Sequence, residues 1–194
     1  MVTFIKLCGF REQSTLDVAL SSNVDAIGFV FAPSPRRVTV EHALPLVALV
    51  GSHAEAVGVF KGSTVSEIVA TASQVGISTV QVHDLRTGAQ VDELHRAGLR
   101  VYRAVAAGSD YTSLGEDGLL VDGSVAGAGA TWDWNLLQRP AQPWILAGGL
   151  SVENVRAGLD ATGAAGVDVS SGIEIERGVK DPTLIERFVA EVRR

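Results

Sequence analysis

The chain has 194 residues, of which 46% are hydrophobic and 20% charged, and its formal net charge is −6. This length suits one folded domain with a substantial core, and the acidic balance argues against nucleic acid as a general partner. A single cysteine excludes an intramolecular disulfide framework, and no signal peptide is evident, so we expect a cytoplasmic protein. No apolar run reaches the roughly 20 residues of a membrane span, so we expect no membrane contact.

Short apolar runs of strand length alternate along the chain with periodic segments typical of helices. The predicted strands are residues 3–7, 26–31, 54–59, 79–82, 99–104, 118–121, 144–147 and 166–169, and the predicted helices are residues 13–21, 40–50, 65–75, 89–97, 152–161 and 181–193. Strands that alternate with helices indicate parallel βαβ units, and eight of them can close into a (β/α)8 TIM barrel.

Barrels of this kind typically have about 250 residues, so we expect short loops and vestigial helices in a single catalytic domain, residues 1–194. An open doubly wound sheet is the structural alternative. The first strand is followed by no G-x-G-x-x-G motif, which weakens that alternative.

Neighbouring side chains on a strand point to opposite faces, which predicts the residues of the barrel interior. We expect the inward set to be Lys6, Cys8, Gln81, His83, Arg103, Asp168 and Ser170, with Asp122 at the carboxyl end of the sixth strand. Burying so many polar groups is costly unless they pair or meet a ligand. Asp168 therefore either pairs with Lys6, on the strand that becomes its neighbour on closure, or contacts a ligand directly.

A lone thiol ends the first strand, directly before a glycine in F-I-K-L-C-G-F. Most free cysteines are small buried hydrophobes, but this end of a barrel strand is where the fold places reactive groups. Asp122 ends the sixth strand, nearly opposite on the ring, before the loop G-S-V-A-G-A-G-A. We predict that Cys8 and Asp122 flank a substrate as general base and general acid. Lys6 would favour the thiolate, and burial beneath the loop would raise the pKa of Asp122.

Glycine-rich turns follow the last two strands, in I-L-A-G-G-L-S-V-E-N-V and G-V-D-V-S-S-G-I-E. Backbone N–H groups at these two turns, with a helix N-terminus, commonly hold phosphate in barrels. The candidate donors are the N–H groups of Gly148, Gly149, Ser171 and Gly172 and the hydroxyls of Ser170 and Ser171. Ser151 is predicted to cap the following helix, with Glu153 in its first turn. Either the glycines only make tight turns, or the ligand is a phosphorylated small molecule, which we favour.

Two further features bear on ligand binding. The loop A-P-S-P-R-R-V-T carries Arg36 and Arg37, either of which can hold a carboxylate in a bidentate manner unless both are solvated. His83 ends the fourth strand and is predicted to touch a ligand, whereas His95 is predicted at the surface of a helix. The four histidines lack metal-ligand spacing, so no metal is predicted.

Taken in chain order, these motifs resemble phosphoribosylanthranilate isomerase, a monomeric or dimeric (β/α)8 enzyme of tryptophan biosynthesis. The resemblance rests on I-K-L-C-G-F, G-F-V-F-A-P-S-P-R-R-V, V-Q-V-H-D, L-L-V-D-G, W-D-W and the two glycine-rich motifs, the last continued by I-E-R-G-V-K-D. It implies that Cys8 is the general base, that Asp122 is the general acid and that Arg36 contacts the anthranilate carboxylate. The turns 148–149 and 170–172 would hold the phosphate.

The implied reaction is an Amadori rearrangement of N-(5'-phosphoribosyl)anthranilate that needs no metal or redox cofactor. The chain departs from the family pattern at Leu7 for Ile, at Asp84 for Gly, and at Ala128 and Ala130 for the Thr and Lys of a closing loop. A paralogue acting on a related phosphoribosylated arylamine and a non-catalytic phosphosugar-binding homologue therefore stay open. The aminoaldose isomerase of histidine synthesis uses paired aspartates where this chain has Cys8, and the missing ligand spacing argues against a metal-dependent epimerase.

Overall fold

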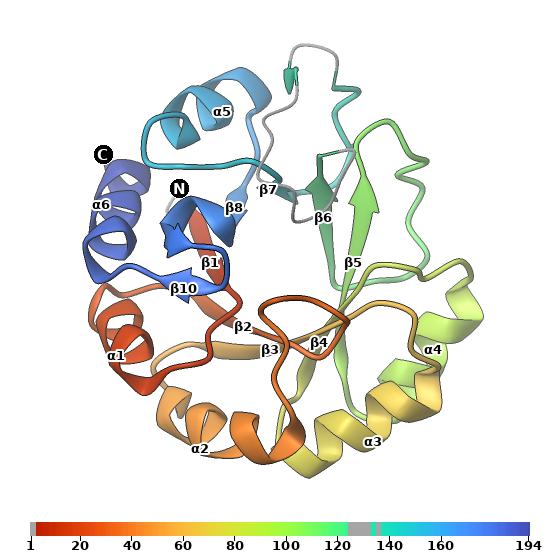
Figure 1. The fold of residues 1–194 in the computed structure, drawn as a ribbon. Helices are drawn as coiled ribbons and strands as arrows, with labels where there is room; N and C mark the ends of the chain where they lie inside the picture. The colour runs from red at the N-terminus through yellow and green to blue at the C-terminus, as the bar shows by residue number, and fades with distance from the viewer. Residues whose placement is uncertain (1–2, 124–132, 135–136) are drawn as a thin grey trace.

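The computed structural model describes residues 3–123, 133–134 and 137–194, which form a closed parallel barrel surrounded by helices (Figure 1). The barrel strands are β1 (Phe4–Cys8), β2 (Ala26–Val30), β3 (Glu55–Phe60), β4 (Thr79–Val82), β5 (Arg100–Ala106), β6 (Gly118–Asp122), β7 (Trp144–Ala147) and β8 (Gly166–Val169). They pair in chain order, and β8 pairs with β1 to close the ring. The predicted (β/α)8 barrel is thus confirmed, and the open sheet is wrong.

The α-helices among the described residues are α1 (Gln13–Ser21), α2 (Val40–Val50), α3 (Val65–Val75), α4 (Gly88–Arg96), α5 (Val155–Thr162) and α6 (Pro182–Arg193). Residues 107–117, which follow β5, form no helix, in line with the expected vestigial connections. After β8 the chain forms a 3-10 turn, η2 (Ser171–Ile173), and a hairpin of β9 (Glu174–Glu176) and β10 (Val179–Lys180) that the sequence analysis did not predict. No helix in the described ranges is long and apolar enough to cross a membrane.

The start of α5 corrects the predicted cap at Ser151. The helix begins at Val155, because the side chain of Asn154 organises a turn before it. Asn154 Oδ1 accepts a hydrogen bond from the Ser151 N–H at 2.8 Å, and Asn154 Nδ2 donates to the Gly149 carbonyl at 2.8 Å. Asparagine side chains compete in this way with helical hydrogen bonds. The Asn154 turn consequently ties the beginning of α5 to the glycines after β7.

The prediction that Arg103 points into the barrel is wrong. Tyr102 and Ala104 occupy the interior, so the alternation of the strand directs Arg103 outward. There Arg103 Nε pairs with Glu116 at 3.0 Å, and Nη2 donates to the Thr112 carbonyl at 2.8 Å. Both partners belong to the helix-free segment 107–117, which therefore supplies polar partners at a place where a helix would present an apolar face.

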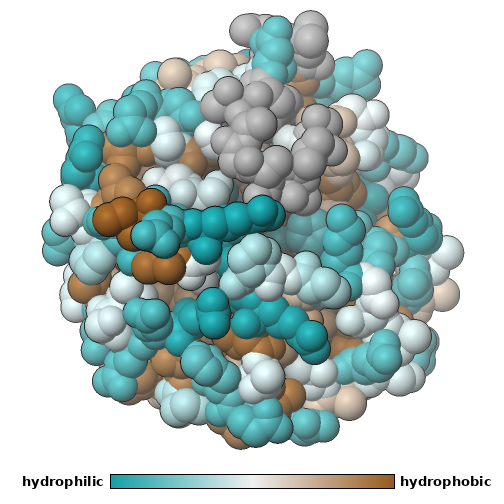
Figure 2. Space-filling model, viewed as in Figure 1, coloured by the Kyte–Doolittle hydropathy of each residue, from teal (hydrophilic) through white to brown (hydrophobic). Residues whose placement is uncertain are grey.

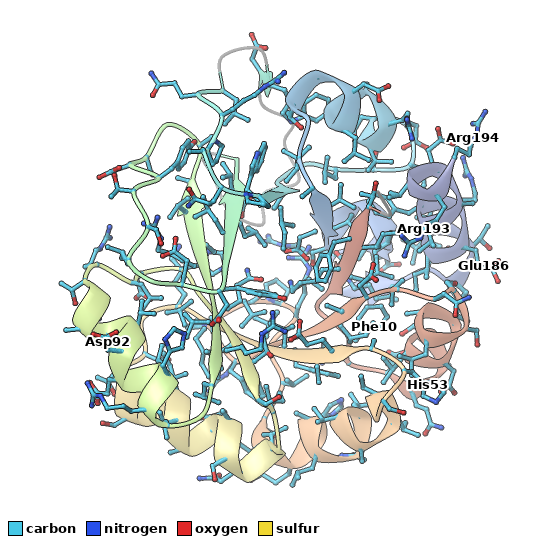
Figure 3. All side chains as sticks on the ribbon, turned by 180° about the vertical axis from the view of Figure 1, so that it is seen from behind. Phe10, His53, Asp92, Glu186, Arg193 and Arg194 are labelled. Carbon is cyan, nitrogen blue, oxygen red and sulfur yellow. The ribbon has the colours of Figure 1, made fainter. Side chains whose placement is uncertain are left out.

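Charged side chains fasten the two ends of the described chain at the amino-terminal face of the barrel. Figure 3 shows this face, with Arg193 at the end of α6. Arg193 donates to the Thr3 carbonyl at 2.6 Å and pairs with Asp25 at 3.1 Å, and Asp25 also accepts from the Ile5 N–H at 2.7 Å. The last helix is thereby fixed beside β1 and the start of β2.

Candidate active site

Figure 1 looks onto the carboxyl ends of the barrel strands, and Figure 2 shows that the centre of this face is mostly hydrophilic. A cavity of about 200 Å³ lies here, and among the predicted site residues it is lined by Cys8, Arg36, His83, Asp122, Asp168 and Ser170. An adjoining cavity of about 60 Å³ is lined by residues of the turns after β7 and β8, and both cavities share Asp122, Asp168 and Ser170. The two form one continuous candidate site.

Cys8 ends β1 and is buried among residues that line the cavity. Its register partner on β2 is Gly28, where an added Cβ would lie 2.7 Å from Cys8 Sγ. Gly28 therefore leaves the space that the thiol occupies. Burial raises the pKa of the Cys8 thiol, while the Lys6 ammonium acts in the opposite direction without outweighing it. Lys6 thus favours the thiolate as expected, but the resting thiol is protonated at neutral pH.

Lys6 and Asp168 form the predicted ion pair, with 2.8 Å between Nζ and Oδ1, and their side chains are 0% and 9% exposed. Burial alone lowers the pKa of Lys6, but attraction to Asp168 and Cys8 outweighs it and raises that pKa overall. Lys6 is therefore charged, and it holds Asp168 at the boundary of the two cavities. Contact of Asp168 with a ligand stays a prediction.

Asp122 ends β6 on the other side of the cavity. Burial and the nearby Asp168 carboxylate raise its pKa to about 6. Its Oδ1 is buried and has no hydrogen-bond partner among the described residues. A Cβ at Gly148 (φ +86°) would lie 2.5 Å from this oxygen, so only glycine permits the close approach. The loop predicted to cover Asp122, with Ala128 and Ala130, lies outside the described residues.

The turns predicted to hold phosphate come together at the smaller cavity, which is lined by Gly148, Gly149, Ser170 and Ser171. Gly172 is not among the lining residues, because it packs against the turn after β7. A Cβ there would lie 1.8 Å from the Leu150 carbonyl oxygen, which no side chain could accommodate. Gly172 therefore allows the two turns to touch, and phosphate binding by all five residues stays a prediction.

Of the two arginines after β2, Arg36 reaches the cavity, whereas Arg37 is exposed and does not line it. Arg36 is buried beside Glu174, the first residue of the β9–β10 hairpin. The hairpin also supplies Lys180, whose Nζ lies 2.9 Å from Glu174 Oε1. Glu174 and Lys180 were not predicted as site residues, since the stretch E-I-E-R-G-V-K carries no periodic signal that distinguishes buried charges from exposed ones.

His83 and Gln81 project from the β4 side of the cavity. Burial, helped by Lys6 and Lys61, lowers the pKa of His83 to about 4, so the imidazole is neutral at neutral pH. Gln81 Nε2 lies 3.2 Å from His83 Nε2, and Gln81 Oε1 is buried with no partner in the described part of the chain. Lys61, which was not predicted as a site residue either, lines the same cavity.

Other sequence features have structural explanations. Asp84, a departure from the family pattern, accepts a hydrogen bond from the Gly62 N–H at 2.7 Å and joins the loops after β3 and β4. His95 lies on the exposed side of α4, which confirms its predicted surface position, and its Nε2 lies 2.8 Å from Asp117 Oδ2. Residues 3–123, 133–134 and 137–194 contain no group of three His, Cys, Asp or Glu that could hold a metal ion.

A comparison with protein-family models matches residues 5–191 to N-(5'-phosphoribosyl)anthranilate isomerase. The chain belongs to this isomerase family. The family that the sequence motifs predicted is therefore confirmed over nearly the whole chain.

The N-(5'-phosphoribosyl)anthranilate isomerase of Granulibacter bethesdensis is 37% identical to this chain, and the match covers 100% of this chain and 99% of the relative. Among solved structures, TrpF from Jonesia denitrificans is 39% identical with a TM-score of 0.89, covering 98% of this chain and 97% of its own. Another isomerase of the family, 28% identical with a TM-score of 0.82 and 98% coverage of both chains, was crystallised with reduced 1-(o-carboxyphenylamino)-1-deoxyribulose 5-phosphate.

Proposed function

We propose that this barrel converts N-(5'-phosphoribosyl)anthranilate to 1-(2-carboxyphenylamino)-1-deoxyribulose 5-phosphate, the activity of its family, with Cys8 and Asp122 as base and acid. One observation carries the residue assignment: a thiol from β1 and a carboxyl group of raised pKa from β6 line the same cavity. Groups on two sides of one ligand can act on two of its atoms without moving.

Asp122 acts first in the proposed reaction. With a pKa of about 6, a useful fraction of this carboxyl group is protonated near neutral pH. It donates its proton to the furanose ring oxygen, the bond between that oxygen and C1 breaks, and the anilino nitrogen supplies the electron pair that forms the C1–N double bond. The product of this step is a ring-opened Schiff base, and Asp122 is left as a carboxylate.

Cys8 acts second. In its thiolate form it removes the proton from C2, and the electron pair moves toward the iminium nitrogen to give an enolamine. Protonation at C1 and loss of the C2 hydroxyl proton then give the ketone. Lys6 and Lys180 favour the thiolate electrostatically, which offsets part of the effect of burial. The substrate nitrogen serves as the electron sink, so the proposal involves no metal or redox cofactor.

The remaining site residues are assigned to binding. The Arg36 guanidinium holds the anthranilate carboxylate, the turns 148–149 and 170–172 hold the phosphate, and His83 and Asp168 contact the sugar. The proposal also includes one catalytic domain over residues 1–194, a cytoplasmic location, a monomer or homodimer, and no nucleic acid or membrane partner.

The test is a turnover assay with freshly generated phosphoribosylanthranilate, followed by the loss of its anthranilate fluorescence. We expect rapid loss with purified protein and none with buffer. The aminoaldose of histidine synthesis and phosphoribosyl adducts of other arylamines are assayed in parallel, because preferential turnover of either would assign a different substrate. Binding of the reduced product without any turnover would identify a non-catalytic homologue and end the proposal.

A further inference from the structure

All of the hydrogen-bonding capacity of the Glu174 carboxylate is used within the protein. Oε1 accepts from Arg36 Nε at 2.6 Å and from Lys180 Nζ at 2.9 Å. Oε2 accepts from Arg36 Nη2 at 2.8 Å and from the Gly178 N–H at 3.0 Å. The Glu174 side chain is 3% exposed. Because these four donors surround it, Glu174 has no lone pair left for a ligand, and any role in the site passes through its partners.

The bond to Glu174 fixes one edge of the Arg36 guanidinium and leaves the other free. Nε and Nη2 form the edge that faces Glu174, and among the described residues the guanidinium makes no other hydrogen bond. A guanidinium carries five N–H donors in a rigid plane, so the edge formed by Nη1 and Nη2 still offers two parallel donors. That geometry fits a second carboxylate. Arg36 lines the cavity that also contains Cys8 and Asp122.

Lys180 is the second basic group of this cluster, so Arg36 and Lys180 share one carboxylate. The hydrogen bonds to Glu174 raise the pKa of Arg36, which keeps its positive charge. Lys180 also donates to the Ser170 carbonyl at 2.8 Å, and the Ser170 hydroxyl donates to the Cys8 carbonyl at 3.0 Å. These bonds connect the guanidinium to the turn after β8 and to the end of β1. The position of Arg36 is therefore fixed relative to the turn predicted to hold the phosphate and to the strand that carries Cys8.

We propose that Glu174 is a positioning residue, which orients the Arg36 guanidinium so that its free edge binds the carboxylate of the aromatic substrate. The inference rests on the proposed function, in which Arg36 binds that carboxylate. Glu174 does not touch the substrate in this arrangement. It decides how well the enzyme distinguishes an aromatic amine that bears an ortho carboxylate from one that does not.

Two ligands test the proposal by isothermal titration calorimetry. One is the reduced carboxyphenylamino product, and the other is the same compound made from aniline, which lacks only the carboxylate. The Glu174→Gln substitution replaces one carboxylate oxygen, which accepts hydrogen bonds, with an amide NH2 group. That group cannot accept a hydrogen bond from Arg36 or Lys180. We expect this variant to bind the first ligand about tenfold or more weakly and the second within about twofold of the parent. The KM for phosphoribosylanthranilate should rise more than kcat falls, since the carboxylate lies away from the reacting carbons.

Controls separate positioning from general damage to the fold. Glu176→Gln makes the same change on the exposed side of the hairpin and should leave both affinities unchanged. In an Arg36→Met background, Glu174→Gln should cause no further loss for the carboxylate ligand. If Glu174→Gln does not fold, Glu174→Asp keeps the charge but shortens its reach, and a loss confined to the carboxylate ligand is again expected.

Equal losses for both ligands, no loss for either, or an undiminished effect of Glu174→Gln without Arg36 would each overturn the positioning role. The parent protein is assayed for turnover first. An inactive parent would refute the proposed function, whereas an active parent with one of those three binding results would refute only the role of Glu174.

Discussion

Lys6 and Asp168 are register partners on β1 and β8, and their buried side chains form an ion pair of 2.8 Å at the seam where the barrel closes. Removing one member of such a pair leaves an uncompensated buried charge, which commonly costs about 3–5 kcal/mol. We therefore expect Lys6→Met to lower the free energy of unfolding by about that amount in urea titrations.

The exposed pair of Arg194 and Glu191 provides a matched control, because Arg194→Met should change the unfolding free energy by less than about 1 kcal/mol. The double variant Lys6→Met, Asp168→Leu should recover part of the loss. A Lys6→Met protein as stable as its parent would contradict a structural role for the pair.

Cys8→Ala should reduce kcat about 10²–10⁴-fold, as expected for loss of a general base, with little change in stability. The thiol is small and is not among the groups proposed to hold the phosphate or the carboxylate, so the reduced product should bind with nearly the parent affinity. Stopped-flow fluorescence and calorimetry measure the two quantities. Near-normal turnover by this variant would remove Cys8 from the proposed mechanism.

The pKa of Asp122, raised to about 6 by burial and Asp168, predicts the pH dependence of the reaction. A general acid acts in its protonated form, whereas Cys8 acts as the thiolate, whose fraction grows with pH because the pKa of the thiol is raised. The loss of protonated Asp122 above about pH 6 offsets that growth, so kcat/KM should rise with pH up to about 6 and stay level from there to pH 8. Asp122→Asn should lower turnover about 10²–10⁴-fold and make kcat/KM rise with pH throughout this range. A parent profile that keeps rising between pH 6 and 8 would show that Asp122 is not the acid.

The same pKa predicts a gain in stability from Asp122→Asn. A carboxyl group whose pKa is higher in the folded state than in the unfolded state binds its proton more tightly when folded. The associated stability is present below about pH 4 and is lost as the pH rises through about 6. Above that range the charged side chain is buried at a cost, so the neutral amide should raise the free energy of unfolding by roughly 1–3 kcal/mol. Urea titrations at pH 4 and pH 8 check this, and equal effects at both would contradict it.

Gly28→Ala should displace the Cys8 thiol, because the new Cβ would lie 2.7 Å from Sγ. We expect kcat to fall about 10–100-fold, as for a small misplacement of a catalytic group, and stability to fall by about 1–3 kcal/mol. Gly58→Ala on β3 is the matched control. Its Cβ would meet the Phe60 ring at 2.8 Å, away from the cavity, so it should affect stability alone. Unchanged turnover in Gly28→Ala would show that the thiol tolerates another position.

The closed barrel and the shared location of Cys8 and Asp122 follow from the sequence, because the order and number of strands determine which strand ends meet. The Lys6–Asp168 pair could be anticipated for the same reason. Arg103 could not be placed, since alternation gives opposite faces but does not say which face is inside. That choice depends on Tyr102 filling the interior and on segment 107–117 pairing with the arginine.

Local competition explains two other differences. Ser151 resembles a helix cap, but the Asn154 side chain forms a turn that delays the helix by three residues relative to that expectation. The β9–β10 hairpin has strands of three and two residues, too short for any periodic pattern. The hairpin also exposes the apolar side chains of Ile175 and Val179, which reverses the usual pattern of buried apolar and exposed charged residues.

The contact between Gly172 and the Leu150 carbonyl has a consequence for engineering. Two turns that meet backbone to backbone cannot be exchanged independently, because a replacement from another protein would bring its own spacing and side chains to that contact. In chimeric barrels assembled from fragments, β7, β8 and the turns that follow them should therefore come from one parent protein. A crossover placed between Leu150 and Gly172 should yield misfolded or inactive hybrids.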